Sequence, residues 1–243
     1  KSNLFTHISY FDKEIDSKDN PNGFMNIPKV TQFNGFNRWE YKDKDYHIGF
    51  TVRGLVEDRE GGTTENAPIP YDVDIHNNLV EFTSKTGMIL PNLPGKSMGL
   101  QTSFRRHNQT AIFGENNYKG LQESAYLNLI RQTYISNTNH ILKYGISYYA
   151  DRYTESFSGY NFNSPFSDKV KVDLISGVFS EYAVKIENNF TLVAGIRADY
   201  YNNTEQINYL PRINMKYNPT ENTAVRFSAG RAFRIANIFV ENT

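Results

Sequence analysis

The sequence has no cysteine and a single tryptophan among its 243 residues. Without cysteine there is no disulfide framework, no thiolate metal site and no cysteine nucleophile. Lysine plus arginine and aspartate plus glutamate number 26 each, so the formal net charge is zero. This balance gives no electrostatic argument for a nucleic-acid partner, and we expect none.

Long hydrophobic runs and stretches of helical period are also missing. The mean hydropathy is −0.59, and no run of 18 apolar residues occurs, which excludes transmembrane helices. A transmembrane β-barrel is not excluded, because alternation of apolar and polar residues lowers the average. The sequence lacks G-x-S-x-G, Walker, H-E-x-x-H and dinucleotide-binding motifs. We therefore expect no enzyme, no catalytic residue and no cofactor.

Apolar and polar residues alternate with a period of two from 186 to 234. Leu192, Ala194 and Ile196 alternate with polar or small residues, and after a polar turn the pattern returns with Ile207, Tyr209 and others. This period is typical of strands with one apolar and one polar face. The stretch predicts three strands in an up-and-down meander.

The same reading along the whole chain predicts about eleven antiparallel strands. Their approximate ranges are 4–10, 31–41, 46–53, 79–90, 97–113, 121–135, 142–149, 172–186, 192–200, 207–217 and 225–230. The segments 57–77 and 152–171 are predicted as long surface loops. Long and short connections mostly alternate, as in outer-membrane barrels, and tyrosines at stripe ends fit an interfacial girdle. Since such barrels have an even strand count, the chain is expected to be a contiguous slice of a larger barrel.

Short motifs occur in a fixed order along the chain. They are Phe36-Asn37-Arg38-Trp39, the stretches 57–62, 84–87, 137–140, 195–200, 210–214 and 217–223, and 228–234. Together they closely resemble the β-barrel of TonB-dependent outer-membrane receptors. Each motif alone is weak, whereas the ordered set is specific. The sequence departs from the family pattern at Ala232, where the family usually has glycine.

The resemblance implies a bacterial outer-membrane transporter with a 22-stranded barrel and an N-terminal plug domain. It also implies uptake of a scarce extracellular ligand, such as a siderophore, a metal or cobalamin, driven by the TonB complex. The expected partners are outer-membrane lipid, the receptor's own plug, TonB and an unknown small ligand. Residues 1–243 are expected to be a partial barrel without plug, TonB box or C-terminal strands, and this piece alone should not transport.

Charged residues on the predicted polar faces are candidates for a barrel lumen. They are Arg53, Arg197, Asp199, Arg212, Lys216, Arg226 and Arg234. They either contact the plug or the passing ligand, or form an ion-pair lattice that keeps a wide barrel rigid. Arg231 falls on the opposite register.

Aromatic and metal-ligating residues of the loops give weaker candidates. The aromatic residues of the second long loop could stack on a ligand or pack among themselves over the barrel mouth. They are Phe157, Tyr160, Phe162 and Phe166. The segment Asp72-Val73-Asp74-Ile75-His76 carries possible cation ligands. Such alternation is common by chance in polar loops, so a solvated loop is the favoured interpretation and we expect no metal site.

Two alternatives to a receptor remain open at the level of sequence. One is a soluble all-β binding module, such as a carbohydrate-binding sandwich, in which the apolar faces meet each other. The other is a β-rich hydrolase, although nothing pairs two carboxylates across a cleft. The start Lys1-Ser2-Asn3-Leu4 lacks a signal peptide's apolar segment, so either the protein is not exported or the chain is part of a longer one. An isolated slice should aggregate, dimerise through its edges or need detergent.

Overall fold

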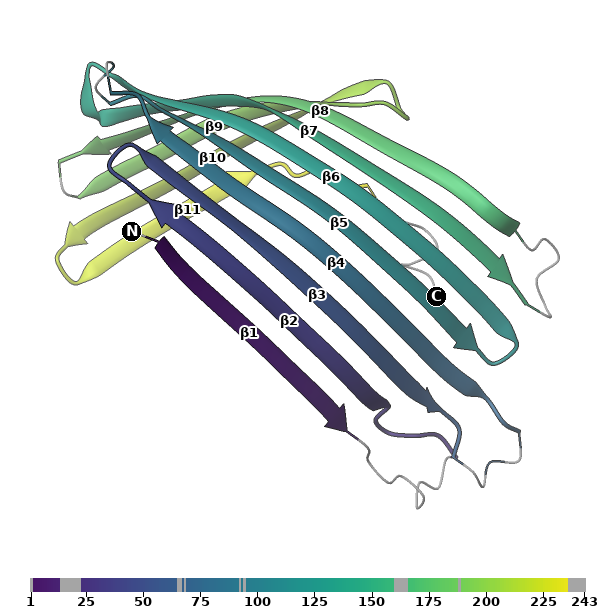
Figure 1. Ribbon diagram of the computed structural model, residues 1–243. Coiled ribbons are helices and arrows are strands. Elements are labelled where there is room, and N and C mark those ends of the chain that lie inside the picture. The colour runs from purple at the N-terminus through teal and green to yellow at the C-terminus, as the bar shows by residue number, and fades with distance from the viewer. Residues whose placement is uncertain are drawn as a thin grey trace. The chain divides into compact units, whose positions relative to one another are not determined.

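The chain forms one antiparallel sheet of eleven strands, in which each strand pairs with the next in sequence (Figure 1). The computed structural model describes residues 2–13, 23–64, 67, 69–91, 93, 95–159, 166–187 and 189–235. The strands are β1 (Ser2–Lys13), β2 (Lys29–Lys42), β3 (Tyr46–Gly62), β4 (Asp72–Ile89), β5 (Ser97–Phe113), β6 (Asn116–Ile135), β7 (Asn137–Ser158), β8 (Phe166–Ile186), β9 (Phe190–Tyr201), β10 (Gln206–Thr220) and β11 (Thr223–Gly230). The predicted strand count and meander are confirmed.

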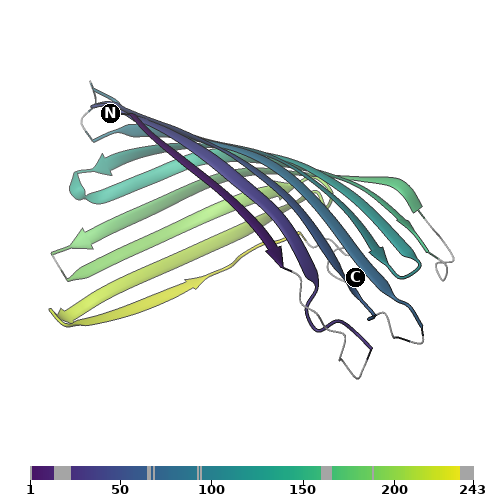
Figure 2. The same ribbon diagram turned by 60° about the horizontal axis from the view of Figure 1, so that its bottom comes forward.

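No helix with the length and apolar character needed to cross a membrane occurs in these described ranges. Each of the strands β2 to β10 lies between its sequence neighbours, and in the second view the purple and blue strands follow one another from the N-terminus in this order (Figure 2). The order begins with β1 and ends with β11, so these two are the edge strands of the described sheet.

The residues group into two compact units. Unit 1 comprises Lys1–Thr86, Gln101–Tyr126 and Ala150–Asp173, and unit 2 comprises Gly87–Leu100, Leu127–Tyr149 and Leu174–Thr243. Unit 1 therefore contains β1 to β3, and unit 2 contains β9 to β11. The strands β4 to β8 each contribute residues to both.

In unit 1 the first three strands pair in continuous register, which sorts their side chains onto two faces. His7 of β1, Phe36 of β2 and Arg53 of β3 are partners across the strands. The alternate residues form an apolar face, on which Leu4, Ile8 and Trp39 are exposed. Because side chains on a strand alternate between faces, Arg53 lies opposite this apolar face, as its sequence pattern predicts.

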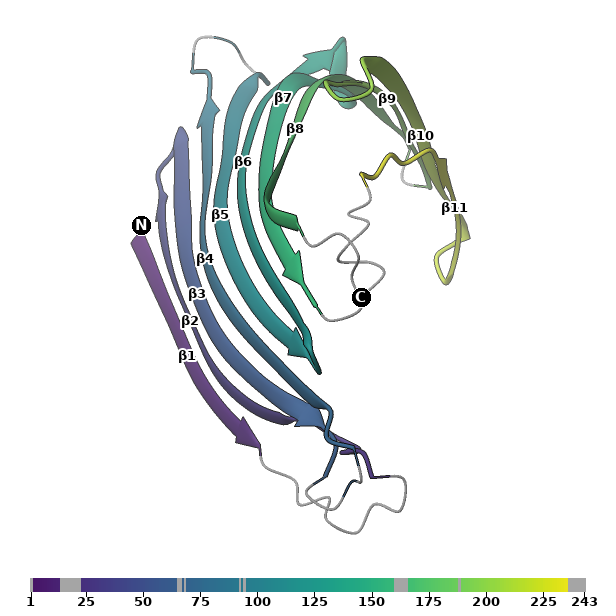
Figure 3. The same cartoon turned by 90° about the vertical axis from the view of Figure 1, so that its right-hand side faces the viewer.

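In unit 2, β8 pairs with β9 and β9 with β10 without a shift, and Figure 3 shows β9, β10 and β11 side by side. Glu181, Gly195 and Arg212 are partners across these three strands. The β10–β11 ladder has an irregularity between Tyr217 and Thr220, next to the turn that joins the strands. The register again separates one polar face from one apolar face.

Several strands extend beyond their predicted ends, so both long-loop predictions were wrong in extent. β3 continues to Gly62 and β4 begins at Asp72, which leaves residues 63–71 as the connection. Polar residues stay in the ladder there because neighbouring strands satisfy their backbone groups, as in the bond from Gly114 N to Asp72 O at 2.7 Å. β7 likewise runs to Ser158 and β8 starts at Phe166.

The expected alternation of connection lengths holds only in part. The first three connections are long, short and long, in agreement with the sequence. The connection after β5, predicted to be of medium length, is the tight turn Gly114-Glu115, in which Gly114 has φ of 59°. Glycine suits this left-handed conformation because it has no Cβ atom.

Candidate functional site

Five of the predicted lumen residues share one face of unit 2. Gly195 pairs with Arg212, and Lys216 pairs with both Thr191 and Arg226. Since paired residues share a face and alternate residues return to it, the whole set can be placed. This surface, called the polar face of unit 2, carries Arg197, Asp199, Arg212, Lys216 and Arg226.

The opposite surface of the same strands is apolar and uncovered. Val178, Ile196 and Phe227 are 57%, 55% and 52% exposed. Large apolar side chains in contact with water are unfavourable, and a contiguous surface of this kind marks contact with a protein or a membrane. The described residues supply no second layer over it, as a soluble sandwich would require.

Arg197 and Asp199 form an ion pair on the polar face. Arg197 Nε lies 2.8 Å from the Asp199 carboxylate, and Arg197 Nη2 donates a hydrogen bond to Ser147 Oγ at 2.7 Å. Asp199 is buried, at 6% exposure. Gly177 pairs with Asp199 in the β8–β9 ladder, and its missing side chain leaves the space that the ion pair fills.

Glu181 lies between two cations on the same face. Arg212 Nη2 donates a hydrogen bond to Glu181 Oε2, and Lys143 Nζ lies 3.6 Å from Oε1. A groove of about 430 Å³ adjoins these residues, and its lining includes Lys143, Glu181, Arg197, Arg212 and Arg231. Four cationic side chains and one carboxylate line it, so the groove favours an anionic or acidic group.

Lys216 and Arg226 present like charges directly opposite each other. Such pairs destabilise a sheet in the absence of a counter-charge. Neither residue forms an ion pair with any residue that the structure describes. Arg234 lies outside the described strands, because β11 ends at Gly230, so the strand register does not place it on this face. Its assignment to the polar face by alternation therefore has no support from the strand pairing.

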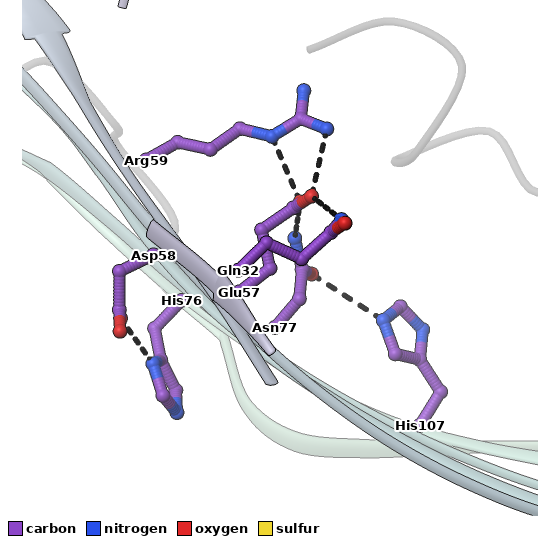
Figure 4. Close-up of polar contacts among 7 residues, drawn as sticks. All are labelled: Gln32, Glu57, Asp58, Arg59, His76, Asn77 and His107. Carbon is purple, nitrogen blue, oxygen red and sulfur yellow. Dashed lines mark hydrogen bonds and ion pairs between the residues drawn. The ribbon is translucent and has the colours of Figure 1, made fainter. Parts of the chain in front are cut away.

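Unit 1 contains a hydrogen-bonded network around Glu57 that the sequence did not reveal. Figure 4 shows Gln32, Arg59 and Asn77 converging on its carboxylate, while Asp58 and His76 meet on the other side of the strand. Gln32 Nε2 donates to Glu57 Oε2 at 2.7 Å, and Arg59 donates from Nε at 2.8 Å and from Nη2 at 3.1 Å. Asn77 Nδ2 donates at 3.3 Å.

This network determines the ionisation of Glu57. The residue is only 5% exposed and lies just beyond Val56, an exposed residue of the apolar face. Burial alone would raise the pKa of Glu57, but the hydrogen bonds from Arg59, Gln32 and Asn77 and the Arg59 charge hold it below its ordinary value. The carboxylate is therefore ionised at neutral pH. The alternation of Glu57 and Arg59 could have indicated that both side chains share one face of a strand, but the two residues fell in a predicted loop.

A second buried cluster in unit 1 joins β6, β7 and β8. Tyr118 Oη donates to Glu155 Oε1 at 2.8 Å, and Gln122 Nε2 donates to both carboxylate oxygens of Asp151 at 3.2 and 3.0 Å. Lys171 Nζ lies 3.0 Å from the buried Asp173. Along β6 and β7 these polar side chains alternate with Glu123 and Arg152, which point to the opposite face. That face is polar here, because the apolar stripe ends before these residues.

The tyrosines of this cluster are held neutral. Burial, together with the Asp151 carboxylate, raises the pKa of Tyr153 to about 12. Burial and the hydrogen bond to Glu155 also raise the pKa of Tyr118. Both groups therefore act as hydrogen-bond donors throughout the physiological range.

The predicted aromatic ligand loop is only partly described. Phe157 belongs to β7 and Phe166 to the start of β8, so neither lies in a loop. Tyr160 and Phe162 lie outside the described residues.

The possible cation ligands are also on a strand, since Asp72 to His76 belong to β4. His76 Nδ1 lies 2.5 Å from Asp58 Oδ1. The described part of the chain brings together no group of three or more metal-ligating side chains.

Comparison with known proteins shows which family has this sequence and fold. The family model described as TonB dependent receptor-like, beta-barrel matches residues 7–243. No curated protein sequence matches the chain. Among solved structures, the Pseudomonas aeruginosa FpvA–pyoverdine–iron complex is 12% identical with a TM-score of 0.67, and the match covers 93% of this chain and 37% of FpvA.

Two further solved structures have the same fold. The RagAB peptide importer is 10% identical with a TM-score of 0.62, over 89% of this chain and 32% of the matched chain. The ferric yersiniabactin uptake receptor FyuA of Yersinia pestis is 9% identical with a TM-score of 0.57, and the match covers 95% of this chain and 37% of FyuA. The chain thus spans about a third to two fifths of the length of these proteins.

Proposed function

Since the chain belongs to the TonB dependent receptor-like β-barrel family, we propose that it forms part of the wall of a bacterial outer-membrane receptor that imports a scarce extracellular ligand. In this proposal the complete protein has a 22-stranded barrel closed by a plug domain, and the TonB complex drives uptake. The apolar face contacts lipid and the polar face lines the lumen. The family is one of receptors and transporters, which favours this function over a soluble carbohydrate-binding module or a hydrolase.

The separation of the two faces by register carries the proposal. Arg197, Asp199 and Arg212 lie on one surface, while Val178 and Ile196 are exposed on the other. A transmembrane barrel needs this arrangement of polar-in and apolar-out residues. A soluble barrel or sandwich needs the reverse, because its apolar faces must be buried.

We further propose that the ligand is a ferric siderophore or a similar chelate. Of the compared proteins, FpvA is described in complex with pyoverdine and iron, and FyuA is described as a ferric yersiniabactin uptake receptor. The excess of cations beside the groove at Arg197 and Arg212 suits an anionic chelate. A peptide, the cargo named for RagAB, is the alternative that an uptake assay would distinguish.

Lys216 and Arg226 are proposed to contact the plug. They face each other without a described counter-charge, on the same surface as the ion pairs. An acidic side chain of the plug would relieve their repulsion. Arg53, on the polar side of β3, is a further candidate for this contact.

Uptake by cells tests the transport function. The full-length gene is expressed in cells that lack their own siderophore receptors, and uptake of a panel of radiolabelled ferric siderophores and peptides is measured. We expect uptake of at least one ferric siderophore that stops when an uncoupler removes the proton gradient. Absence of uptake of every compound, or uptake unaffected by the uncoupler, would contradict the proposal.

Cysteine labelling tests the assignment of the faces. The chain has no cysteine, so single substitutions in the full-length protein give an unambiguous label if the rest of it is also cysteine-free or made so. Ser228→Cys, an exposed position of β11 on the polar face, should react with a water-soluble maleimide in intact outer membranes. Val178→Cys on the apolar face should react only after detergent extraction. Labelling in the opposite sense would refute the orientation.

A further inference from the structure

A dent interrupts the apolar face of unit 1 across β4 to β8. Its volume is about 410 Å³, and its lining includes Phe82, Phe104, Arg106, Ala125, Ala150 and Arg152. Phe104 is 51% exposed and the side chain of Arg106 is 69% exposed. The dent therefore opens to the surroundings of the barrel wall.

Alternation along each strand places these side chains on the apolar face. His107 hydrogen-bonds Asn77 in the Glu57 network on the polar side, so Arg106 points the other way. Gln122 and Asp151 hydrogen-bond each other on the polar side, so Ala125, Ala150 and Arg152 also lie on the apolar side.

The shape of the dent follows from side-chain size. Ala125 and Ala150 contribute only methyl groups, while Phe82 and Phe104 at the same site are large. Small residues between large ones leave a hollow. The lining also includes Arg105, Ser124 and Asp151, which alternation assigns to the polar side of the sheet. The lining residues on the apolar side are apolar except for the two arginines and Glu123. An acyl chain fits such a surface, because its burial against these groups removes apolar area from water.

On the apolar side of the sheet, the charged lining residues of the dent are Arg106, Arg152 and Glu123. Arg106 Nε lies 3.9 Å from Glu123 Oε1, a long ion pair between exposed side chains, which is weak. Arg152 is exposed and forms no ion pair with any residue in the described ranges. The two arginines and Glu123 together carry one net positive charge. The planar guanidinium group of arginine can donate two parallel hydrogen bonds to the oxygens of a phosphate.

We propose that this dent is a binding site for a phosphorylated lipid of the membrane leaflet around the receptor. The acyl chain lies over Ala125 and Ala150, and the phosphate is held by Arg106 and Arg152 at the end of the apolar stripe. This proposal rests on the proposed function, because the dent meets lipid only if the apolar face lies in the membrane.

Native mass spectrometry of the full-length protein in detergent tests the site. The probes are bisphosphorylated lipid A, its enzymatically dephosphorylated form and inorganic phosphate. We expect one tightly bound lipid A per receptor, at least tenfold weaker binding of the dephosphorylated lipid, and no comparable binding of inorganic phosphate. Equal binding of both lipids, or phosphate binding as tight as that of lipid A, would overturn the proposal.

Two sets of variants localise the binding. The double variant Arg106→Gln, Arg152→Gln should lose at least tenfold in lipid A affinity. The control Lys44→Gln, Lys85→Gln removes the same charge at a strand turn and on the polar side of β4, and should bind like the wild type. Ala125→Leu, Ala150→Leu fills the hollow while keeping both arginines and should also weaken binding. Retention of wild-type affinity by the arginine variant, or an equal loss in the lysine control, would refute the site.

The failure of this site and the failure of the receptor function are separate results. Heat-modifiable migration in gel electrophoresis shows whether each variant barrel is folded. If cysteine labelling places Val178 in lipid but the arginine variant binds lipid A normally, only the lipid site is refuted. If labelling reverses the faces, the proposed function fails with it.

Discussion

Gly177 and Asp199 are partners in the β8–β9 ladder, and the ion pair of Asp199 with Arg197 occupies the space above the glycine. A Cβ atom on Gly177 would lie 2.6 Å from Arg197 Nη2 and 2.8 Å from Ser147 Oγ. No side chain larger than hydrogen fits without displacing these groups. The glycine is thus part of the ion-pair arrangement on the polar face.

The first prediction is that Gly177→Ala destabilises the barrel. Overpacking of this kind costs about 1–3 kcal/mol, because the Arg197 side chain must leave its partners. Unfolding of the full-length protein by urea in detergent micelles measures the change. Gly54→Ala is the matched control, since a Cβ there meets nothing within 4 Å. Equal stabilities of the two variants would show that the Arg197 contacts adapt at no cost.

The second prediction concerns Glu181, which is shared by Lys143 and Arg212. A double-mutant cycle of Glu181→Gln and Arg212→Gln should give a coupling free energy of about 0.5–1 kcal/mol, because the Arg212 side chain is largely exposed. The coupling should shrink in 1 M salt, which screens exposed charges. A coupling near zero at low salt would mean that the pair contributes no net stability. Lys143→Gln in the same cycle separates the share of the second cation.

The third prediction is a loss of stability in acid that depends on Glu57. Because the pKa of Glu57 is lower in the folded than in the unfolded protein, its stabilising effect is present above the unfolded pKa of about 4.3. It is lost as the pH falls through the folded pKa. The unfolding free energy should therefore drop more steeply below about pH 5 in the wild type than in Glu57→Gln. Parallel curves for the two proteins would contradict this.

The alternation of side chains allowed the faces of the sheet to be predicted from sequence. Leu192, Ala194 and Ile196 alternate with small and polar residues, and the register with β8 and β10 keeps this sorting across the sheet. Strand count and meander followed from the same pattern and from the polar turns. These features depend on local sequence, which is why they could be read without a structure.

Strand ends and side-chain networks could not be read in this way. Residues Glu57 to Gly62 are polar or glycine, and Asp72 to Asn77 are polar except for Val73 and Ile75, so their composition resembles a loop. They remain in strands because their backbone groups pair with neighbouring strands, which is a tertiary effect. The convergence of Gln32, Arg59 and Asn77 on Glu57 also depends on register across three strands. Arg234 was assigned to the polar face by continuing the alternation past the predicted strand 225–230, and β11 ends at Gly230.

The last prediction is a delayed ionisation of Tyr153. Burial and the nearby Asp151 carboxylate both disfavour the phenolate, so the pKa of Tyr153 lies at about 12 instead of the ordinary 10. The difference in tyrosinate absorbance between wild type and Tyr153→Phe should have its midpoint near pH 12. Because the folded pKa is raised, the stabilisation from neutral Tyr153 is complete below pH 10 and is lost as the pH rises towards 12.

The variant Asp151→Asn separates the two causes of this shift. It removes the charge but leaves the burial, so the midpoint for Tyr153 should fall towards 10 without reaching it. A midpoint that stays at about 12 would assign the whole effect to burial. A wild-type midpoint near 10 would mean that the cluster of Tyr153, Asp151 and Asp173 is open to water, in conflict with the 5% and 2% exposure of the two carboxylates.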